Sequence, residues 1–504
     1  MFALFALWSL FCCGRLFPVN RMPVVQFFNT LSREIEGFVP RQEGRVAMYV
    51  CGSTVYAPPH LGHARMAVVF DMIRKYFEFA GYDVTFVSNF TDVDDKIIAR
   101  AQEQGIPAAA VAEKNITIWE ENMRRLGVAL PDIAPKATAH IPEMLEMIRV
   151  LIEKEYAYVV DGDVYFRVDA IPSYGRLSGQ KLEDLQVGAR VLPGEKKKSP
   201  FDFVLWKAAK PGEPSWDSPW GAGRPGWHIE CSAMGVHYLG MGFDIHGGGS
   251  DLIFPHHENE IAQAEACMQS EPFARYWVHN GLVKLDGEKM AKSTGNFVSV
   301  SELLQEHTSQ AVRLLVAQTH YRKALDFSSS LIAEAETAVE RLGLCRDRLV
   351  AAGAGMPASA IQGTSLYEEV SADEKAMSAF RAAMENDFAT PGAVAALFEL
   401  VKRANTLLEA QDHDLEALAG AARAISEIDR VLGVVPPAKH SEGDTALLPE
   451  LMQLLLDVRE QARAQRDFDL SDLIRDRLDE VGIIVEDTPQ GTRWRARRRQ
   501  TPGL

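Results

Sequence analysis

The feature that most constrains the fold is a strand, a helix and a second strand in close succession near the start of the chain. Residues 45–51 form a largely apolar run typical of a buried strand, and two prolines then break the chain. Over 60–79 apolar residues recur every three or four positions, which predicts a helix, and 83–88 predicts a second strand. Such a unit builds a parallel sheet, whose ligands gather where the strands end. Cys51 and Thr91 are expected at two such ends.

The rest of the chain divides by composition. Its 504 residues exceed what one hydrophobic core usually supports, so we expect more than one domain. Frequent proline, glycine and lysine over 146–225 indicate an insertion within the sheet domain, and helical spacing dominates after residue 328. Ser371 and Glu374 form a capping-box pattern at the start of one of these helices. Residues 445–495 predict a helix and two strands. The predicted class is therefore α/β: a Rossmann-like parallel-sheet domain with an insertion, then a helical bundle and a small mixed α/β C-terminal module.

Charge and cysteine content limit the class of protein. The formal net charge of −16 argues against a surface coated with nucleic acid, although a few basic residues suffice for a local phosphate-binding face. The basic C-terminus is either such a face or a solvated tail, and consists of Arg493, Arg495, Arg497, Arg498 and Arg499. Six scattered cysteines are too few for a disulfide framework, which favours a reducing compartment.

The first residues differ from the remainder of the chain. Residues 1–13 are almost wholly apolar, like the core of a signal peptide, but they lack its basic start and small-residue cleavage site. They are also shorter than the roughly 20 residues that span a bilayer. Strand-like patterning begins just after Met22. We therefore expect Met22 to be the start and 1–21 to be an extension that is not native, with an export signal as the less favoured alternative. A cytoplasmic protein without a membrane partner is expected.

A histidine motif opens the first predicted helix. His60 and His63 are three residues apart and so project from the same face of its first turn. A helix N-terminus attracts anions through its free N–H groups and its dipole, so two imidazoles there can donate to phosphate oxygens. Gly62 leaves room for a flat base beside the backbone. Without the preceding buried strand, the motif would more often be a pair of ordinary surface histidines.

A lysine motif, Lys289-Met290-Ala291-Lys292-Ser293, occurs far along the chain. Gly287 predicts a hairpin turn just before it, so both lysines are expected on a loop. Ammonium groups on a loop can approach a triphosphate as charge develops on it. Taken alone, two lysines in a loop are usually solvated charge.

Together, the two motifs resemble the two signatures of class I aminoacyl-tRNA synthetases. Further segments are similar to the cysteine-specific family, namely 49–56, 89–95, 226–234, 244–252 and 254–260. On these motifs, the chain is identified as a member of the cysteinyl-tRNA synthetase family over about residues 24–494. Ser53, Leu61 and Ala291 are mild departures from the family's usual residues.

The resemblance implies an ATP-dependent ligase that forms cysteinyl-adenylate from L-cysteine and ATP–Mg²⁺ and transfers cysteine to the 3′ end of tRNA(Cys). No protein nucleophile is required. The implied catalytic residues are His60, His63, Lys289 and Lys292, and ATP is implied to contact His60, Gly62, His63 and Lys292. The partners are tRNA(Cys), L-cysteine and ATP, and a monomer is expected.

The resemblance also implies one zinc ion per chain with four protein ligands, Cys51, Cys231, His256 and Glu260. Their chemistry agrees, since two thiolates, an imidazole and a carboxylate suit tetrahedral Zn²⁺. Pro255 is placed to start a helix, on which His256 and Glu260 would lie one turn apart. Cys267 and Cys345 are expected to be core residues, and His257 and Glu258 are not assigned to the metal.

A zinc ion would allow the protein to distinguish cysteine from serine, two substrates that differ by one atom. A shaped pocket rejects a near-isostere poorly. A thiol with a pKa near ~8.5 ionises readily on a metal, whereas an alkyl hydroxyl does not. No editing site is therefore needed.

Further residues are implied only by their position in the family's motifs. The substrate pocket is implied to contain Thr54, Thr91, Trp227 and Asp251, with Asp251 receiving the substrate ammonium group and Trp227 closing over the substrate. Anticodon contacts are implied at Arg463, Phe468, Asp472, Arg475 and Asp487, where Phe468 could stack on a base.

The expected domains combine these inferences. They are an N-terminal extension (1–21), a Rossmann-like catalytic domain (22–145 and 226–275), a connective insertion (146–225), a lysine-loop and stem-contact region (276–327), a helical bundle (328–440) and an anticodon-binding module (445–504).

Three alternatives remain open from the sequence. A mycothiol-type cysteine ligase acting on an amino sugar would share the zinc and phosphate motifs but lack the anticodon module. A zinc hydrolase is suggested by residues 256–260, but it leaves the histidine and lysine motifs unexplained. A non-catalytic tRNA-binding protein would be expected to lose signature residues that are all present here.

Overall fold

The protein is described by a computed structural model over ten ranges of the chain: 24–180, 196–270, 272–285, 288–289, 297–354, 371–437, 442–465, 467–480, 483–488 and 491–496. The expected extension at 1–21 lies outside these ranges. The chain divides into two compact units, Met1–Pro436 and Pro437–Leu504. Within the ranges described, none of the helices has both the length and the apolar character that a membrane span requires.

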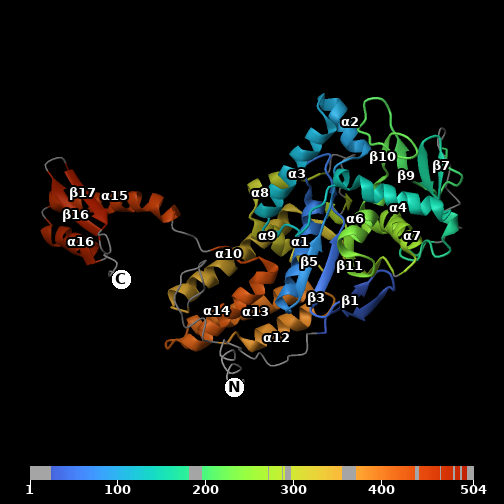
Figure 1. Ribbon diagram of the computed structural model, residues 1–504. Coiled ribbons are helices and arrows are strands. Elements are labelled where there is room, and N and C mark those ends of the chain that lie inside the picture. The colour runs from blue at the N-terminus through green and yellow to red at the C-terminus, as the bar shows by residue number, and fades with distance from the viewer. Residues whose placement is uncertain are drawn as a thin grey trace, which may run out of the picture. The chain divides into compact units, whose positions relative to one another are not determined.

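The centre of the larger unit is a four-stranded parallel sheet in the order β12, β11, β3, β5 (Figure 1). Its strands are β3 (Arg45–Val50), β5 (Asp83–Val87), β11 (Phe243–Gly249) and β12 (Ala274–Asn280). Helix α1 (Leu61–Phe79) follows β3 and precedes β5, so the predicted strand–helix–strand unit and the predicted Rossmann-like class are confirmed.

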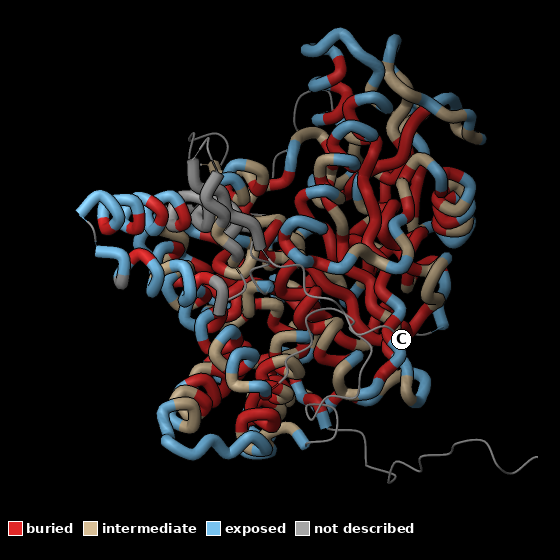
Figure 2. The backbone as a smooth tube through the Cα atoms, turned by 90° about the vertical axis from the view of Figure 1, so that its left-hand side faces the viewer, coloured by how far each residue is buried: buried red, intermediate tan, exposed pale blue. Residues whose placement is uncertain are grey.

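Strand β3 divides the core because successive side chains point to opposite faces of a sheet. Val46, Met48 and Val50 pack into one hydrophobic cluster with the apolar face of α1. Tyr49 and Cys51 pack into a second cluster on the other face, with residues of α4 (Ile141–Glu153), α6 (Trp227–Leu239) and α7 (Glu258–Met268). Figure 2 shows the buried segments gathered in the interior, with exposed segments around them. Both faces of the sheet are covered, as expected for parallel strands.

Further helices and small sheets surround this core. The helices are α2 (Asp95–Gln104), α3 (Ala108–Arg125), α8 (Val300–Glu306) and α9 (Ser309–Ala317), with a 3₁₀ turn over Ala137–His140. The small sheets pair β1 (Gln26–Asn29) with β2 (Glu34–Gly37), β4 (Ser53–Thr54) with β6 (Phe90–Thr91), and β13 (Val283–Leu285) with both β14 (Glu288–Lys289) and β15 (Leu325–Phe327).

An antiparallel sheet lies within the range predicted as an insertion. Its order is β10, β9, β8, β7, and the strands are β7 (Ala157–Val160), β8 (Asp163–Phe166), β9 (Phe203–Ala208) and β10 (Gly223–Pro225). Strand β10 leads through Gly226 directly into α6, so the end of this sheet positions the start of a core helix.

Helices α10 (Ser329–Ala351), α12 (Glu374–Met384), α13 (Thr390–Leu408) and α14 (Leu415–Leu432) form a bundle that continues the α1 side of the core. The capping box predicted at Ser371 is wrong. Asp373 is the N-cap of α12, and its carboxylate accepts from the backbone N–H of Ala376 at 2.9 Å and pairs with Arg403. Aspartate caps a helix as well as serine does, so the nearer residue takes the position.

The smaller unit contains α15 (Glu442–Ala464), α16 (Phe468–Glu480) and an antiparallel pair, β16 (Ile483–Thr488) and β17 (Gly491–Ala496). Met452, Leu456 and Leu478 form its small core. The predicted order of a helix followed by two strands is present.

Candidate active site

The first two strands of the sheet continue side by side past their ends. Beyond β3 and β5, strands β4 and β6 pair in parallel and bring Thr54 opposite Thr91. Gly52 allows this approach: a Cβ atom there would lie 1.5 Å from the carbonyl oxygen of Asn89. The Gly52 N–H donates to the Asn89 side chain at 2.9 Å. Any other residue at this position would force the two strand extensions apart.

Four side chains that the sequence singled out meet beside these strand ends. One donor atom from each of Cys51, Cys231, His256 and Glu260 lies within 4.8 Å of the other three, and all four residues are buried. The two sulfur atoms are 3.5 Å apart, Cys51 Sγ lies 3.3 Å from Glu260 Oε1, and His256 Nε2 lies 3.0 Å from the same oxygen. Cys51 directly follows β3, Cys231 lies in α6, and His256 and Glu260 lie just before and in the first turn of α7.

The local structure before α7 agrees with the prediction. Within Ile253–His257 only Phe254 has non-helical backbone angles, and helical conformation continues from Pro255 into α7, which begins at Glu258. The Phe254–Pro255 peptide bond is cis. His256 and Glu260 therefore lie one turn apart on a continuous helical segment, and their side chains meet.

The buried charges of this cluster stabilise one another. Burial raises the pKa of Cys51, whereas the hydrogen bond from Cys51 lowers the pKa of Cys231 to about 6. Burial alone would raise the pKa of Glu260 and lower that of His256. Attraction to His246 and His256 instead lowers the pKa of Glu260 well below its usual value, and attraction to Glu260 raises that of His256 to about 10. The cluster thus combines a thiolate, a carboxylate and a protonated imidazole out of contact with water.

This donor set fits a metal ion. Two sulfurs, one nitrogen and one oxygen within reach of a common centre are the ligands that tetrahedral Zn²⁺ prefers. The second Glu260 oxygen, Oε2, lies 2.7 Å from His246 Nε2, and His246 Nδ1 lies 3.0 Å from the carbonyl oxygen of Tyr49. Such outer contacts hold a ligating carboxylate in place.

The sequence analysis gave no role to the histidines that surround the cluster, of which it named only His257. His228 Nδ1 lies 2.9 Å from His256 Nδ1, and His257 Nδ1 lies 2.8 Å from His279 Nε2. His246 contacts Glu260, as described above. A signal was available for His246, because it lies in the middle of the fully buried strand β11, where a polar residue needs a partner.

Glu230 was also missed. It is fully buried in α6, and it accepts a 2.6 Å hydrogen bond from Thr91 Oγ1. Burial raises the pKa of Glu230 well above its usual value. Thr91 is therefore held by a buried carboxyl group at the edge of the cluster.

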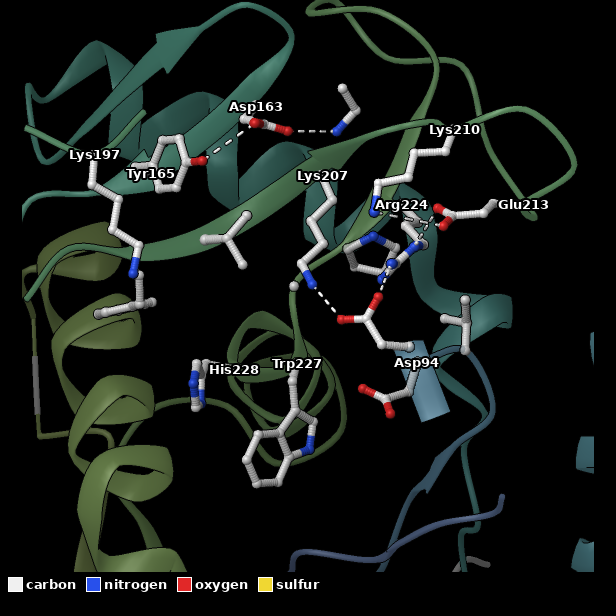
Figure 3. A pocket seen from close by; sticks show the side chains of 17 residues that line it. Asp94, Asp163, Tyr165, Lys197, Lys207, Lys210, Glu213, Arg224, Trp227 and His228 are labelled. Atoms are coloured by element: carbon white, nitrogen blue, oxygen red, sulfur yellow. Dashed lines mark hydrogen bonds and ion pairs between the residues drawn. The ribbon is translucent and has the colours of Figure 1, made fainter. Parts of the chain in front are cut away.

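The other predicted pocket residues lie nearby but differ in exposure. The indole of Trp227 stacks on the His256 ring, with centroids 4.1 Å apart, and is 38% exposed. Trp227 and His228 line a cavity of about 500 Å³ between the insertion sheet and the start of α2 (Figure 3). Thr54 is half-buried in β4. Asp251 is exposed in a 3₁₀ turn after β11.

The insertion is tied to the core at this cavity by a charged cluster. Asp95, at the start of α2, pairs with Lys207 of β9 at 2.5 Å and with Arg224 of β10, and Arg224 also pairs with Glu213. Figure 3 shows Trp227 and His228 on the side of the cavity opposite Asp163 and Tyr165. The cavity thus adjoins the side chain that covers His256.

The histidine motif has a structural role that the sequence did not suggest. His60 is the N-cap of α1: its Nδ1 accepts from the Gly62 N–H at 3.1 Å, and His63 Nδ1 accepts from the His60 N–H at 3.2 Å. The two rings stack with centroids 3.8 Å apart. Two histidines therefore form a reciprocal capping box at the positive end of the helix dipole.

The lysine motif is described only in part. The hairpin predicted at Gly287 is supported by the antiparallel pairing of β13 with β14, in which Leu285 is opposite Glu288. Lys289 ends strand β14 rather than lying on a loop, so that part of the prediction is wrong. Ala291 and Lys292 lie outside the described residues.

The predicted anticodon residues lie on the smaller unit. Arg463 is exposed near the end of α15, and Phe468, which is 58% exposed, starts α16. Asp472 and Arg475 form an exposed ion pair at 3.3 Å on the same helix. Asp487 is in β16, and its side chain is outside the described part of the structure. The same holds for the side chains of Arg493 and Arg495 in β17 and for the whole of Arg497, Arg498 and Arg499.

Comparison with known proteins identifies the family. Residues 37–337 match the family model described as tRNA synthetases class I (C) catalytic domain, 379–436 match the DALR domain, and 445–495 match the cysteinyl-tRNA ligase anticodon binding domain. The cysteine–tRNA ligase of Desulfitobacterium hafniense is 50% identical over 475 residues, which are 93% of this chain and 99% of that protein. The chain belongs to the cysteinyl-tRNA synthetase family. The enzyme of Geobacter sulfurreducens, another cysteine–tRNA ligase, is 47% identical over 94% of this chain and all of that protein. Members of this family are ATP-dependent ligases, and so is this chain.

Solved structures of other synthetases share the fold. Methionyl-tRNA synthetase of Mycobacterium tuberculosis, in complex with methionyl-adenylate, superposes with a TM-score of 0.56 at 15% identity, over 77% of this chain and 92% of that one. A leucyl-tRNA synthetase of Agrobacterium radiobacter, in a ternary complex, superposes with a TM-score of 0.54 at 12% identity, over 79% and 85%. At these identities the likeness concerns the fold alone.

Proposed function

We propose that this cysteine–tRNA ligase selects L-cysteine with a zinc ion held by Cys51, Cys231, His256 and Glu260. The observation that carries the proposal is the convergence of these four buried donor atoms within 4.8 Å of one another. A bound zinc ion would accept the ionised thiol of cysteine, which a serine hydroxyl cannot imitate. The chain's own residues then hold the rest of the substrate.

The proposed pocket surrounds the cluster. Trp227 covers the imidazole of His256 and would shield the substrate side chain from water. Thr91 is fixed by Glu230 and, with Thr54 opposite it, would line the pocket at the strand ends. Asp251, exposed just after β11, would receive the substrate ammonium group.

Adenylate formation needs only positioning and charge stabilisation. The carboxylate of cysteine attacks the α-phosphate of ATP, and pyrophosphate leaves. His60 and His63 would contact the phosphates at the positive end of α1, and Gly62 would leave space for the nucleotide. Lys289 and Lys292 would neutralise the charge that develops on the leaving group, with Mg²⁺ accompanying the ATP.

The second step transfers the cysteinyl group to the 3′ end of tRNA(Cys). In the smaller unit, Phe468 would stack on an anticodon base, and Arg463, Asp472, Arg475 and Asp487 would contact its edges or backbone. The match of residues 445–495 to an anticodon-binding domain supports tRNA as the acceptor and disfavours an amino sugar. The monomeric state and the cytoplasmic location stay predictions from the sequence.

Metal content and substrate choice test this proposal together. Purified protein should hold one zinc ion per chain and should catalyse pyrophosphate exchange with cysteine about 10⁴-fold better than with serine. tRNA charging should follow with the same preference. Protein that holds no stoichiometric metal, yet discriminates between the two amino acids equally well, would contradict the proposal.

A further inference from the structure

Arg65 lies in α1 two residues beyond His63 and is 1% exposed. Its guanidinium donates to four backbone carbonyl oxygens. Nη1 contacts those of Gly281 at 2.8 Å and Leu282 at 2.6 Å, and Nη2 contacts that of Tyr321 at 3.2 Å and that of Lys323. One side chain thus joins α1 to two other segments of the chain, 281–282 and 321–323.

These two segments form the base of the hairpin that carries Lys289. Gly281 donates its N–H to the carbonyl oxygen of Tyr321 at 2.8 Å, and Leu325 donates to that of Leu282 at 2.9 Å. Strand β13 begins at the next residue, Val283, and pairs with both β14 and β15. The Arg65 contacts therefore fix the point from which β13 and β14 extend.

The contact between these two segments leaves no space for a side chain at Gly281. A Cβ atom at Gly281 would lie 2.4 Å from the carbonyl oxygen of Lys323. Burial lowers the pKa of Arg65 to about 10, so the guanidinium stays protonated at neutral pH. Its planar fork can satisfy several carbonyl groups at once, whereas an ammonium group has three donors and no fixed plane.

The residues that follow the lysine motif also contact the start of α1. Leu61 donates its N–H to the carbonyl oxygen of Val298 at 3.0 Å, and Val300 donates to that of Pro59 at 3.0 Å. The His60 ring meets the ring of Phe297 edge to face, with centroids 5.4 Å apart. The described residues on both sides of the motif are thus held to one helix end.

We propose that Arg65 is a positioning residue, which fixes the β13–β14 hairpin and Lys289 relative to His60 and His63. The inference rests on the proposed function, in which these side chains meet one triphosphate. Arg65 does not touch the substrate in this role. It acts through the backbone, where a shift of about 1 Å between catalytic groups can cost roughly a hundredfold in rate.

The test compares Arg65→Met with Arg313→Met by cysteine-dependent pyrophosphate exchange in the full-length, zinc-loaded enzyme. Arg313 is a matched control: it is also 1% exposed, and it donates to the carbonyl oxygen of Leu432 and to Asp71 of the same helix. Arg65→Met should lower kcat about a hundredfold and leave the KM for cysteine within about twofold. Arg313→Met should lower the thermal midpoint but change kcat less than about threefold. Equal loss of kcat in both variants would mean that Arg65 only stabilises the fold, and would overturn the proposal.

Two further variants keep the test decisive if Arg65→Met does not fold. Arg65→Lys retains the charge and should recover part of kcat. Gly281→Ala leaves Arg65 intact but forces the two segments apart, so it should lower kcat with little change in the KM for cysteine. An unchanged kcat in Gly281→Ala would overturn the proposal.

A Lys289→Ala background separates this inference from the proposed function. If Arg65 acts through the hairpin, Arg65→Met should lower kcat by a smaller factor in that background than in the wild-type enzyme. The same fold-decrease in both backgrounds would count against the inference. If Lys289→Ala alone leaves exchange unchanged, the proposed role of Lys289 fails. If Lys289→Ala lowers exchange and Arg65→Met does not, only the inference fails.

Discussion

His60 offers a way to separate the stability of α1 from phosphate chemistry at its end. Its Nδ1 accepts from the Gly62 N–H at 3.1 Å, so His60→Ala removes the cap together with the ring. Loss of an N-cap costs about 1 kcal/mol. For a unit of some 400 residues, an unfolding entropy of about 2.1 cal/mol/K per residue converts this into a fall of about 1 °C in Tm. Asparagine caps a helix well, so His60→Asn should leave Tm near that of the wild type.

The two variants should behave alike in catalysis. Both lack the imidazole that we propose to contact the phosphates, and removal of one such donor costs on the order of 10²-fold in kcat. Differential scanning calorimetry and cysteine-dependent pyrophosphate exchange measure the two effects independently. His237→Ala is a suitable control, because His237 is an exposed histidine of α6 that pairs with Glu143 rather than with α1. Full exchange activity in His60→Asn would refute the reasoning, since the ring would then serve only as a cap.

Three further predictions concern the lysine motif, the metal cluster and the insertion. Lys292→Ala should lower adenylate formation at least about tenfold and leave the zinc content unchanged, as measured by pyrophosphate exchange and metal analysis. Cys231→Ser should lose zinc and the preference for cysteine over serine, whereas Cys267→Ser, at a buried cysteine outside the cluster, should retain both. Burial would raise the pKa of Asp95, but its basic partners, Lys207 on β9 and Arg224 on β10, hold it below its usual value. Asp95→Asn should therefore reduce stability by less than about 1 kcal/mol at neutral pH. In unfolding measured against pH, the difference from the wild type should vanish as the pH falls through the lowered pKa of Asp95 and the wild-type carboxylate is protonated.

The sequence predicted those parts of the fold that depend on local patterns. Periodicity over 45–88 gave the strand–helix–strand unit, because burial on one helix face and in two strands imposes regular spacings on neighbouring residues. The helical start at Pro255 was predicted because proline favours the first position of a helix, whereas the cis peptide bond before it has no local pattern that could predict it. The cap at Asp373 was missed because the more distant Ser371 fits the same pattern.

The candidate site likewise contains residues that sequence motifs reveal and residues whose contacts only the folded structure reveals. Cys51, Cys231, His256 and Glu260 were found by their resemblance to family motifs, not by spacing, since Cys51 and Cys231 are 180 residues apart. His246 lies in the family-like segment 244–252, but its contact with Glu260, like that of His279 with His257, exists only in the folded structure and could not be read from the sequence. Arg65 was missed for a similar reason: its partners are backbone carbonyls 216 or more residues away, and carbonyl groups leave no trace in the sequence.

The buried polar contacts of α1 explain why this helix positions more than its own histidines. Near its start Arg65 contacts the hairpin base, and in its middle Asp71 pairs with Arg313, which also contacts the carbonyl oxygen of Leu432 at the end of α14. A buried ion pair adds little net stability, but removal of one partner leaves an uncompensated charge and is strongly destabilising. Such contacts therefore fix one arrangement of the segments they join. Because His60 and His63 are at the end of the same helix, the effect of a change should depend on which segment it releases. Loss of the Arg65 contacts releases the hairpin of Lys289 and should lower kcat, whereas loss of the Arg313 contacts releases the helical bundle and should lower stability.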